Sequence, residues 1–400
     1  MPNPSLPTSP SPAPAPAPSP APLDPEAAPS ATDPSPSALV DREGVRAGVD
    51  EALHVATAAL RDELSSTHPD ADPLADATDE LLAGGKRLRA AFCYWSWRAH
   101  GGDPDGPHRD VVLRAGAALE LFQAAALFHD DVMDASDTRR GHPTAHRAFG
   151  ARHRALGWSG DADRYGENTA ILLGDLALIA SHRELGDALD ALPTDVATRS
   201  RVVFGRMQTE VIVGQYLDVQ AQVLPWGDDP AADEERARAV IRSKSARYSV
   251  EHPIALGAAL AGADDAAVAA TSAFGLPVGE AFQLRDDVLG VFGDARVTGK
   301  PAGDDLREGK RTVLVVRALA AATPAQRDLL LTHLGDPGLD ASTVEELRAV
   351  LVETGARDAV ESLIAELTDR ASSALAGAGL DEPGAAMLGL LARAAVQRTA

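Results

Sequence analysis

The sequence predicts an all-α protein, a helical bundle around a deep central cavity. Apolar residues recur at steps of three or four, as at Val45, Val49, Leu53, Ala56 and Leu60, and this spacing is typical of an amphipathic helix. No long segment alternates apolar and polar residues as a half-buried strand would. Two acidic motifs end apolar helical runs far apart in the chain, and a bundle can bring such helices face to face.

Composition excludes several classes of protein. Of the 400 residues, 45% are hydrophobic, which is ample for a large core. The 37 Lys and Arg against 59 Asp and Glu give a formal net charge of -22, so we expect no nucleic-acid partner. The single cysteine, Cys93, cannot form an internal disulfide, which fits a reducing cytoplasm. No uninterrupted apolar run reaches the ~18 residues of a membrane span, so we expect no membrane-spanning helix.

The chain divides into two parts by composition. Residues 1–37 are Pro, Ala and Ser in near alternation. Such a segment cannot bury enough apolar surface to fold, so we expect a disordered tail. Residues 38–400 carry the helical pattern and are predicted to form a single helical domain.

A basic turn separates the first two predicted helices. It reads Gly84-Gly85-Lys86-Arg87-Leu88-Arg89. Glycines would let the next helix N-terminus approach an anion, and Lys86 and Arg89 share a helical face at i and i+3. The turn is a candidate anion site, with a solvated basic surface as the alternative.

The predicted helix over residues 111–135 carries the first acidic motif. Asp130 and Asp134, at i and i+4, lie on one face. Two carboxylates at this spacing suit Mg²⁺, because like charges repel unless a cation lies between them. Arg139 and Arg140 follow closely, and carboxylates, metal and guanidinium groups together favour a polyphosphate site. An acidic face in contact with water is the alternative, and we expect the loop after Arg140 to cap the site.

Polar residues interrupt three further predicted helices. Asp175 follows Gly174 within residues 169–182, and we favour a cavity-lining role, in which Gly174 lets another backbone come close. Gln215 and Asp218 interrupt residues 207–223, and Lys244 places a cation in an apolar setting. For each of these, a position on an ordinary polar stripe is the competing interpretation.

A second acidic motif strengthens the case for a shared metal site. Asp286 and Asp287 end another apolar helical run, and Lys300 and Lys310 follow. Two acidic helices facing each other can share divalent ions. Residues 324–400 add amphipathic helices without obvious chemistry, which we expect to complete the bundle or form a dimer surface.

From about residue 40 to the C-terminus, the chain resembles the trans-isoprenyl (polyprenyl) diphosphate synthases, and within them the geranylgeranyl diphosphate synthases. Seven motifs carry the resemblance, in order: GGKRLR (84–89), HDDVMD with RRG (129–141), GD (174–175), GQYLD (214–218), KS (244–245), FQLRDD (282–287) and TGKPAGDDLREGKRT (298–312). The resemblance implies an isoprenoid synthase-type helical bundle, a homodimer, and a reaction between isopentenyl diphosphate and an allylic diphosphate.

The resemblance also implies a role for each matching residue. Three Mg²⁺ ions would be carried by Asp130, Asp134 and Asp286, and the implied catalytic set is completed by Asp131, Arg139, Lys244, Asp287 and Lys300. Isopentenyl diphosphate would be bound by Lys86, Arg89 and Arg140, and the remaining implied substrate-binding residues are Arg87, Gln123, Gln215, Asp218, Ser245 and Lys310. Three positions depart from the usual pattern: Gln123 stands where His is common, Ser245 where Thr is commoner, and Gly290 where many members have a third Asp.

Chain length should be set by side chains upstream of Asp130. Ala125 and Ala126 are too small to stop a C15 chain, whereas Phe122, a turn further back, can act as the floor. We therefore expect an all-trans C20 product, with C25 or longer as the alternative.

Two other functions share part of this pattern. A class I terpene cyclase also uses Mg²⁺ on acidic helices, but it needs no second diphosphate site. A non-catalytic partner subunit would be expected to have lost ligands, whereas both aspartate pairs stand here.

Overall fold

The structure is a computed structural model that describes residues 39–293 and 303–397. The predicted tail over residues 1–37 therefore lies outside the described residues, as does Lys300. The N-terminal half contains η1 (Arg42–Gly44), α2 (Val45–Thr67), η2 (Pro69–Ala71), α3 (Asp72–Leu82), α4 (Leu88–Ala99), α5 (Arg109–Met133), β1 (Thr138–Arg139), β2 (His142–Pro143), α6 (Ala145–Ala155) and α7 (Ala162–Leu189). The C-terminal half contains α8 (Thr194–Val223), α9 (Pro230–Val240), η3 (Ile241–Glu251), α10 (His252–Leu260), α11 (Asp265–Phe292), α13 (Asp304–Arg307), α14 (Val313–Ala321), α15 (Pro324–His333), α16 (Ala341–Glu353), α17 (Ala356–Gly377) and α18 (Gly384–Val396).

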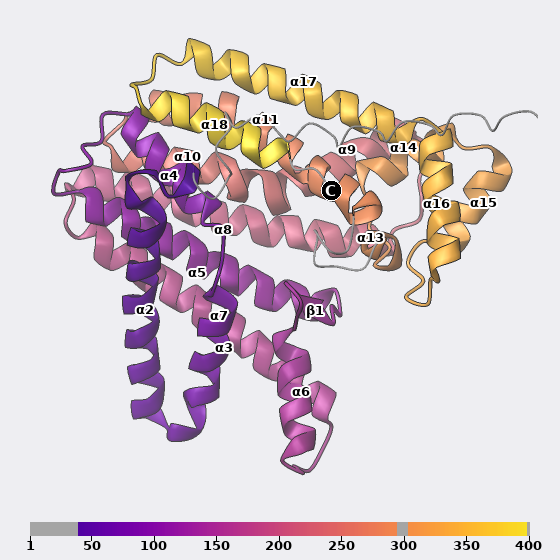
Figure 1. Ribbon diagram of the computed structural model, residues 1–400, viewed down its shortest axis with the longest axis horizontal. Helices are drawn as coiled ribbons and strands as arrows, with labels where there is room; N and C mark the ends of the chain where they lie inside the picture. Colours follow the sequence, from indigo (N-terminus) through magenta and orange to yellow (C-terminus); the bar gives the residue numbers. More distant parts are fainter. Residues whose placement is uncertain (1–38, 294–302, 398–400) are drawn as a thin grey trace, which may run out of the picture. The chain divides into compact units, whose positions relative to one another are not determined.

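This element order confirms the all-α prediction (Figure 1). The helices begin where the sequence supplies caps. The Asp161 carboxylate accepts hydrogen bonds from the Asp163 and Arg164 backbone N–H groups at the start of α7, and Thr323 with Gln326 forms a capping box on α15. The helices α7 and α8 run to 28 and 30 residues, longer than the predicted segments over 169–182 and 207–223.

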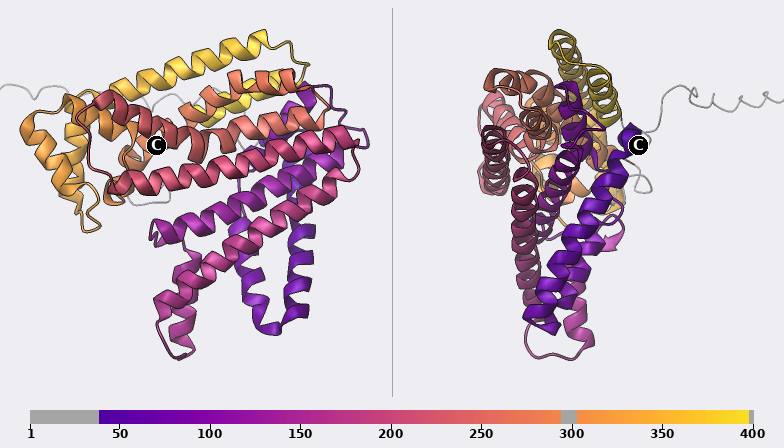
Figure 2. Two further views of the ribbon diagram at one scale, coloured as in Figure 1. Left: turned by 180° about the vertical axis from the view of Figure 1, so that it is seen from behind. Right: turned by 90° about the vertical axis from the view of Figure 1, so that its left-hand side faces the viewer.

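The core lies in two hydrophobic clusters that meet on α11. The first cluster takes residues from α2, α4, α5, α7, α8 and α10, and the second takes residues from α9, α11 and α13 to α17. Phe274 and Val278 of α11 belong to the first cluster, whereas Leu284 and Val288 belong to the second. Figures 1 and 2 show α5 beside α7, and α17 running along α11. The helices α5 and α11 are those that carry the two acidic motifs.

A small hairpin replaces the expected loop after α5. Thr138 pairs with Pro143 and Arg139 with His142 in antiparallel register. The two residues between the strands, Arg140 and Gly141, have φ angles of 53° and 80°, which is the left-handed pair that a type I′ hairpin turn requires. The hairpin places Arg139 on β1, where it contacts Asp131, and Arg140 in the turn, where it contacts the Leu81 carbonyl.

One described helix is long and apolar enough to be tested as a membrane span. This is α5, whose apolar window has a mean hydropathy of 1.6 but is 78% buried inside the protein. Its apolar character therefore serves core packing.

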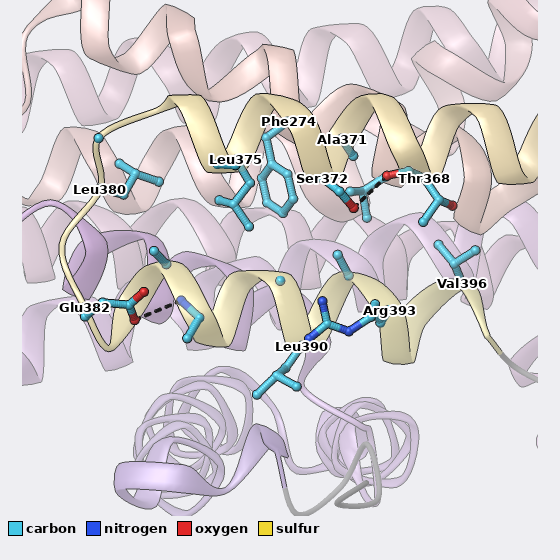
Figure 3. Close-up of a pocket in the computed structure, with 17 residues that line it drawn as sticks. Phe274, Thr368, Ala371, Ser372, Leu375, Leu380, Glu382, Leu390, Arg393 and Val396 are labelled. Carbon is cyan, nitrogen blue, oxygen red and sulfur yellow. Dashed lines mark hydrogen bonds between the residues drawn. The ribbon is translucent and has the colours of Figure 1, made fainter.

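A pocket of about 560 Å³ opens between α11, α17 and α18. Figure 3 shows Phe274, Leu375 and Leu390 among the side chains that line it, with Glu382 and Arg393 beside them. None of the predicted site residues lines this pocket. It is therefore separate from the candidate site described next.

Candidate functional site

The first acidic motif lies at the C-terminal end of α5, where three cations face it. Lys244 Nζ lies 2.9 Å from Asp130 Oδ1. The Arg139 guanidinium donates to Asp131 through Nε at 2.8 Å and Nη2 at 2.5 Å, and its Nη2 lies 3.6 Å from Asp130 Oδ2. Lys310 Nζ lies 3.8 Å from Asp134 Oδ2. The structure thus brings the predicted Asp130, Asp131 and Asp134 together with three predicted cations.

A π-helix positions Lys244. The 11-residue η3 packs between α8 and α11, and π-helical turns are often found at functional sites. A Cβ at Gly214 of α8 would lie 2.6 Å from Lys244 Cα, and one at Gly279 of α11 would lie 2.7 Å from Ala246 C. Only glycine permits these close approaches, so the two glycines let η3 direct Lys244 into the site, where its Nζ also lies 2.6 Å from Asp218 Oδ2.

The electrostatics of the first motif differ from one carboxylate to the next. Burial opposes ionisation of Asp130, but the nearby charges of Lys244, Lys310 and Arg139 outweigh it and hold the pKa of Asp130 below its usual value. Burial and the negative charge of Asp130 raise the pKa of Asp134 to about 6. Burial also opposes the charge on Lys244, yet Asp130 and Asp218 raise the Lys244 pKa above its usual value. Lys244 therefore stays a cation throughout the physiological range.

The second motif also contains a buried aspartate, Asp287. Asp287 accepts a hydrogen bond of 2.8 Å from Gln283 Nε2. Burial, together with the charge of Asp305, raises the pKa of Asp287 to about 8. Its neighbour Asp286 is half-buried on the same helix. Lys310 Nζ reaches toward this side as well, lying 3.6 Å from Asp305 Oδ1.

The carboxylates fit a divalent metal that arrives together with a phosphorylated ligand. Asp134 Oδ1 is buried and has no hydrogen-bond partner, and the buried Asp130 Oδ1 faces the Lys244 ammonium at 2.9 Å. Each is a carboxylate oxygen that suits a hard cation. Within residues 39–293 and 303–397, no three carboxylate, imidazole or thiolate groups are close enough to hold an ion by themselves. Mg²⁺ is usually held by one or two carboxylates together with substrate phosphates and waters, so this donor set fits it.

A second group of cations surrounds the turn after α3. Arg89 donates a 2.9 Å hydrogen bond to Ser249 Oγ, and Arg140 Nη1 donates to the Leu81 carbonyl at 3.2 Å. Burial and the charges of Arg139, Arg87 and Arg89 lower the pKa of Arg140, which reflects several guanidinium groups gathered in one place. Lys86 is exposed at the same turn.

Arg87 serves a different purpose from the predicted one. Its side chain is only 6% exposed, and its guanidinium donates to Asp50, Glu120 and the Leu82 carbonyl at 2.7, 3.2 and 2.7 Å. All three contacts are inside the fold, so Arg87 supports the turn from below and has no nitrogen directed at a ligand. The sequence could not distinguish it from its two basic neighbours.

The predicted floor residue lies in a cluster of aromatic rings. Phe122 is 4% exposed and packs edge-on against Phe204 at 6.3 Å and Tyr248 at 5.9 Å between ring centroids. The guanidinium of Arg89 stacks on the opposite part of this cluster, 4.2 Å from the Tyr248 ring centroid. Phe204 and Tyr248 come from α8 and η3, so their meeting with Phe122 could not be seen from residue spacing.

The remaining predicted site residues make few specific side-chain contacts in the described part of the chain. Gln215 Nε2 lies 3.5 Å from Met133 Sδ, while Gln123 and Ser245 are half-buried and Ala125 and Ala126 lie on the inner part of α5. Asp175, which we expected to line the cavity, has a side chain that is 57% exposed, and its Oδ1 lies 3.4 Å from His129 Nε2. Gly174 makes room for the His129 imidazole rather than for a backbone, since a Cβ there would lie 2.6 Å from His129 Cε1. No role was predicted for Gln283 or Asp305, although both lie within motifs that carry the family resemblance, at 282–287 and 298–312.

Known proteins resemble this chain in sequence and fold. The family model for polyprenyl synthetases matches residues 71–351. A geranylgeranyl diphosphate synthase of Sulfolobus acidocaldarius is 33% identical over 67% of this chain and 73% of its own length, and a geranylfarnesyl diphosphate synthase of Aeropyrum pernix is 32% identical over 76% and 87%. A crystal structure of a Corynebacterium glutamicum geranylgeranyl pyrophosphate synthase, in complex with isoprenyl diphosphate and magnesium, is 35% identical with a TM-score of 0.82, covering 90% of this chain and 99% of its own. With a matching family model over most of the chain, relatives of more than 30% identity and a shared fold, the protein belongs to the polyprenyl synthetase family.

Proposed function

We propose that the protein is a Mg²⁺-dependent, head-to-tail prenyltransferase that condenses isopentenyl diphosphate with an allylic diphosphate, and that its main product is all-trans geranylgeranyl diphosphate (C20). One observation carries the proposal: two separate groups of cations. Lys244, Arg139 and Lys310 face the aspartates of α5, whereas Arg89 and Arg140 gather at the turn after α3. A reaction between two diphosphates needs two such places.

Metal ions would be held by Asp130, Asp134 and Asp286, and we expect three of them, as the family resemblance implies. When bound, they supply positive charge that favours departure of the allylic diphosphate. The half-buried position of Asp286 on α11, the helix that also carries Asp287, supports its inclusion. We expect the protein to work in the cytoplasm, where its single buried thiol, Cys93, stays reduced.

The chain's own cations do the rest of the electrostatic work. Lys244 and Arg139 would bind the oxygens of the allylic diphosphate and stabilise the charge that grows as its C–O bond breaks. Pyrophosphate leaves with the bonding electron pair, and the double bond of isopentenyl diphosphate, held by Lys86, Arg89 and Arg140, attacks the allylic carbon. The proton that is then lost passes to the departing pyrophosphate. The product is longer by one C5 unit.

Chain growth would end at the aromatic cluster. The small side chains of Ala125 and Ala126 would let the growing chain pass along α5, and Phe122, which packs against Phe204 and Tyr248, would stop it. The relatives named above include both C20 and C25 synthases, so a C25 or longer product is the alternative.

A kinetic comparison of two variants tests the carrying observation. Arg89→Gln should raise KM for isopentenyl diphosphate at least tenfold with a much smaller change for the allylic substrate. Lys244→Gln should lower kcat by on the order of 10²–10³, because it removes charge stabilisation at the leaving group. Equal effects of both variants on both substrates would mean that the two groups of cations do not serve separate diphosphates.

The rival functions fail differently in the same assay. A class I terpene cyclase would release hydrocarbon without isopentenyl diphosphate and would be indifferent to Arg89→Gln. A non-catalytic subunit would give no turnover in either wild type or variant.

We further propose that two copies of the chain form a homodimer through α7 and α8. Large apolar side chains are exposed on both helices, among them Ile179, Val202 and Ile212, which is 62% exposed. Figure 2, seen from behind, shows α7 and α8 at the front of the described helices. Water-exposed apolar patches of this kind mark protein interfaces.

Ile212→Asp tests the dimer. Light scattering coupled to size-exclusion chromatography should give about twice the chain mass for wild type and a single chain mass for Ile212→Asp. Val55→Asp is the matched control, because Val55 is 59% exposed on α2, and it should leave the mass unchanged. A wild-type monomer at micromolar concentration would refute the homodimer.

A further inference from the structure

The second acidic motif lacks a side chain one turn after its aspartate pair, and another residue fills the space. Asp286 and Asp287 are followed on α11 by Gly290. A Cβ placed on Gly290 would clash with the Asp305 carboxylate, lying 2.6 Å from its Cγ. Asp305 comes from α13. Its carboxylate therefore stands where a side chain at position 290 would begin.

A cation already lies between this carboxylate and the first acidic motif. Lys310 Nζ is 3.6 Å from Asp305 Oδ1 and 3.8 Å from Asp134 Oδ2, and it also contacts Glu308. The ammonium group thus marks a position that attracts positive charge from both acidic helices.

Asp134, on the other side of the Lys310 ammonium, carries a buried oxygen that lacks a partner. Its side chain is only 5% exposed, and its Oδ1 has no hydrogen-bond partner. A buried carboxylate oxygen without a partner is costly, and a bound cation removes that cost. Asp305 approaches α11 at Gly290, and Lys310 lies between its carboxylate and Asp134 of α5.

We propose that Asp305 of α13 supplies the third carboxylate that the second acidic motif lacks. Its carboxylate would bind a divalent cation that is held together with the diphosphate, either directly or through a water molecule. The inference rests on the proposed function for the presence of that diphosphate. Gly290 and Asp305 then form one unit, because any side chain at position 290 displaces the Asp305 carboxylate. Carboxylates that act on a metal in this way typically change its affinity 10–100-fold.

The test is a Mg²⁺ titration followed by thermal denaturation of the full chain, with inorganic pyrophosphate present and no turnover required. Asp305→Asn should raise the Mg²⁺ concentration at half-maximal stabilisation by about tenfold or more. Asp304→Asn, the same charge change one residue earlier on α13, is the matched control and should shift it by less than about threefold.

Gly290→Ala makes the result independent of folding damage. Alanine in a helix interior is favoured over glycine by about 1 kcal/mol, so general destabilisation is not its expected effect. Its Cβ nevertheless displaces the Asp305 carboxylate, so the Mg²⁺ midpoint should rise as in Asp305→Asn. The double variant Gly290→Asp/Asp305→Gly, which moves the carboxylate to α11, should return the midpoint to within about threefold of wild type.

Unchanged Mg²⁺ midpoints in both Asp305→Asn and Gly290→Ala would overturn the inference. The same holds if Asp304→Asn matches Asp305→Asn. Wild-type condensation of isopentenyl diphosphate is measured separately by product formation, so a failure of the proposed function and a failure of this inference give different results.

Discussion

Truncation of Phe122 to alanine should lengthen the product by one C5 unit. The ring is 4% exposed and packs edge-on against Phe204 and Tyr248. Removing a buried Phe side chain typically costs about 3–5 kcal/mol of folding stability through lost contacts and the cavity left behind. An additional isoprene unit of five carbons gains about 0.8 kcal/mol for each buried CH₂, or about 4 kcal/mol in total. The burial free energy of the extra isoprene unit is thus close to the free energy lost with the Phe122 ring. A longer product therefore becomes favourable only in the variant, where the ring no longer occupies the space.

The assay combines isopentenyl diphosphate and a C15 allylic diphosphate, with product length read by mass spectrometry. Wild type should give mainly C20, and Phe122→Ala should give mainly C25. Phe149→Ala is the matched control: Phe149 is also buried, but it packs on Tyr165 between α6 and α7 and should not change product length. A Phe122→Ala enzyme that melts at a lower temperature and still stops at C20 would show that the floor lies elsewhere.

Two side-chain contacts in the fold and the requirement for metal can each be tested separately. Arg87→Met should lower the free energy of unfolding by about 3–5 kcal/mol in urea denaturation, because it leaves Glu120 buried without its cation; a change below 1 kcal/mol would contradict the supporting role of Arg87. Although burial opposes ionisation of Glu210, hydrogen bonds from His252 and Arg206 hold its pKa at about 2. A carboxyl group with a lowered pKa stabilises the fold above its ordinary pKa of about 4.5, and this stabilisation is lost as the pH falls toward 2. The free energy of unfolding of wild type should therefore exceed that of Glu210→Gln by on the order of 1–2 kcal/mol at pH 6, a figure reduced for the partial exposure of the carboxylate, and by clearly less at pH 3. A difference that does not change with pH would argue against the contacts of Glu210 with His252 and Arg206. Removing Mg²⁺ with a chelator should abolish turnover yet leave the far-ultraviolet circular dichroism of the helices intact, because Lys244 and Lys310 already face the aspartates; loss of helix would refute this.

The sequence predicted the chemistry of the first acidic motif well, because that information is local. Helical periodicity puts Asp130 and Asp134 on one face, and Arg139 follows within a few residues. The sequence could not show which cation lies beside each aspartate. The contact between Lys244 and Asp130 joins residues more than a hundred positions apart, and it depends on a π-helix that no propensity rule indicates.

Errors arose where several residues of one type were adjacent. Arg87 and Arg89 look alike in sequence, yet one is buried against Glu120 and the other stacks on Tyr248. The hairpin after α5 was missed because its strands contain two residues each, too few for an alternating pattern. The approach of Asp305 to Gly290 could not be predicted, because the two residues come from different helices and the contact depends on how α13 packs against α11.

Product formation by the purified full chain tests the prenyltransferase assignment most directly. The protein is incubated with Mg²⁺, isopentenyl diphosphate and the C5, C10 or C15 allylic diphosphate in turn, and chain length is read by mass spectrometry. We expect a C20 diphosphate from each allylic substrate, and no product when isopentenyl diphosphate is left out. Cyclised hydrocarbon in the absence of isopentenyl diphosphate, or no turnover by folded protein with Mg²⁺ present, would contradict the assignment.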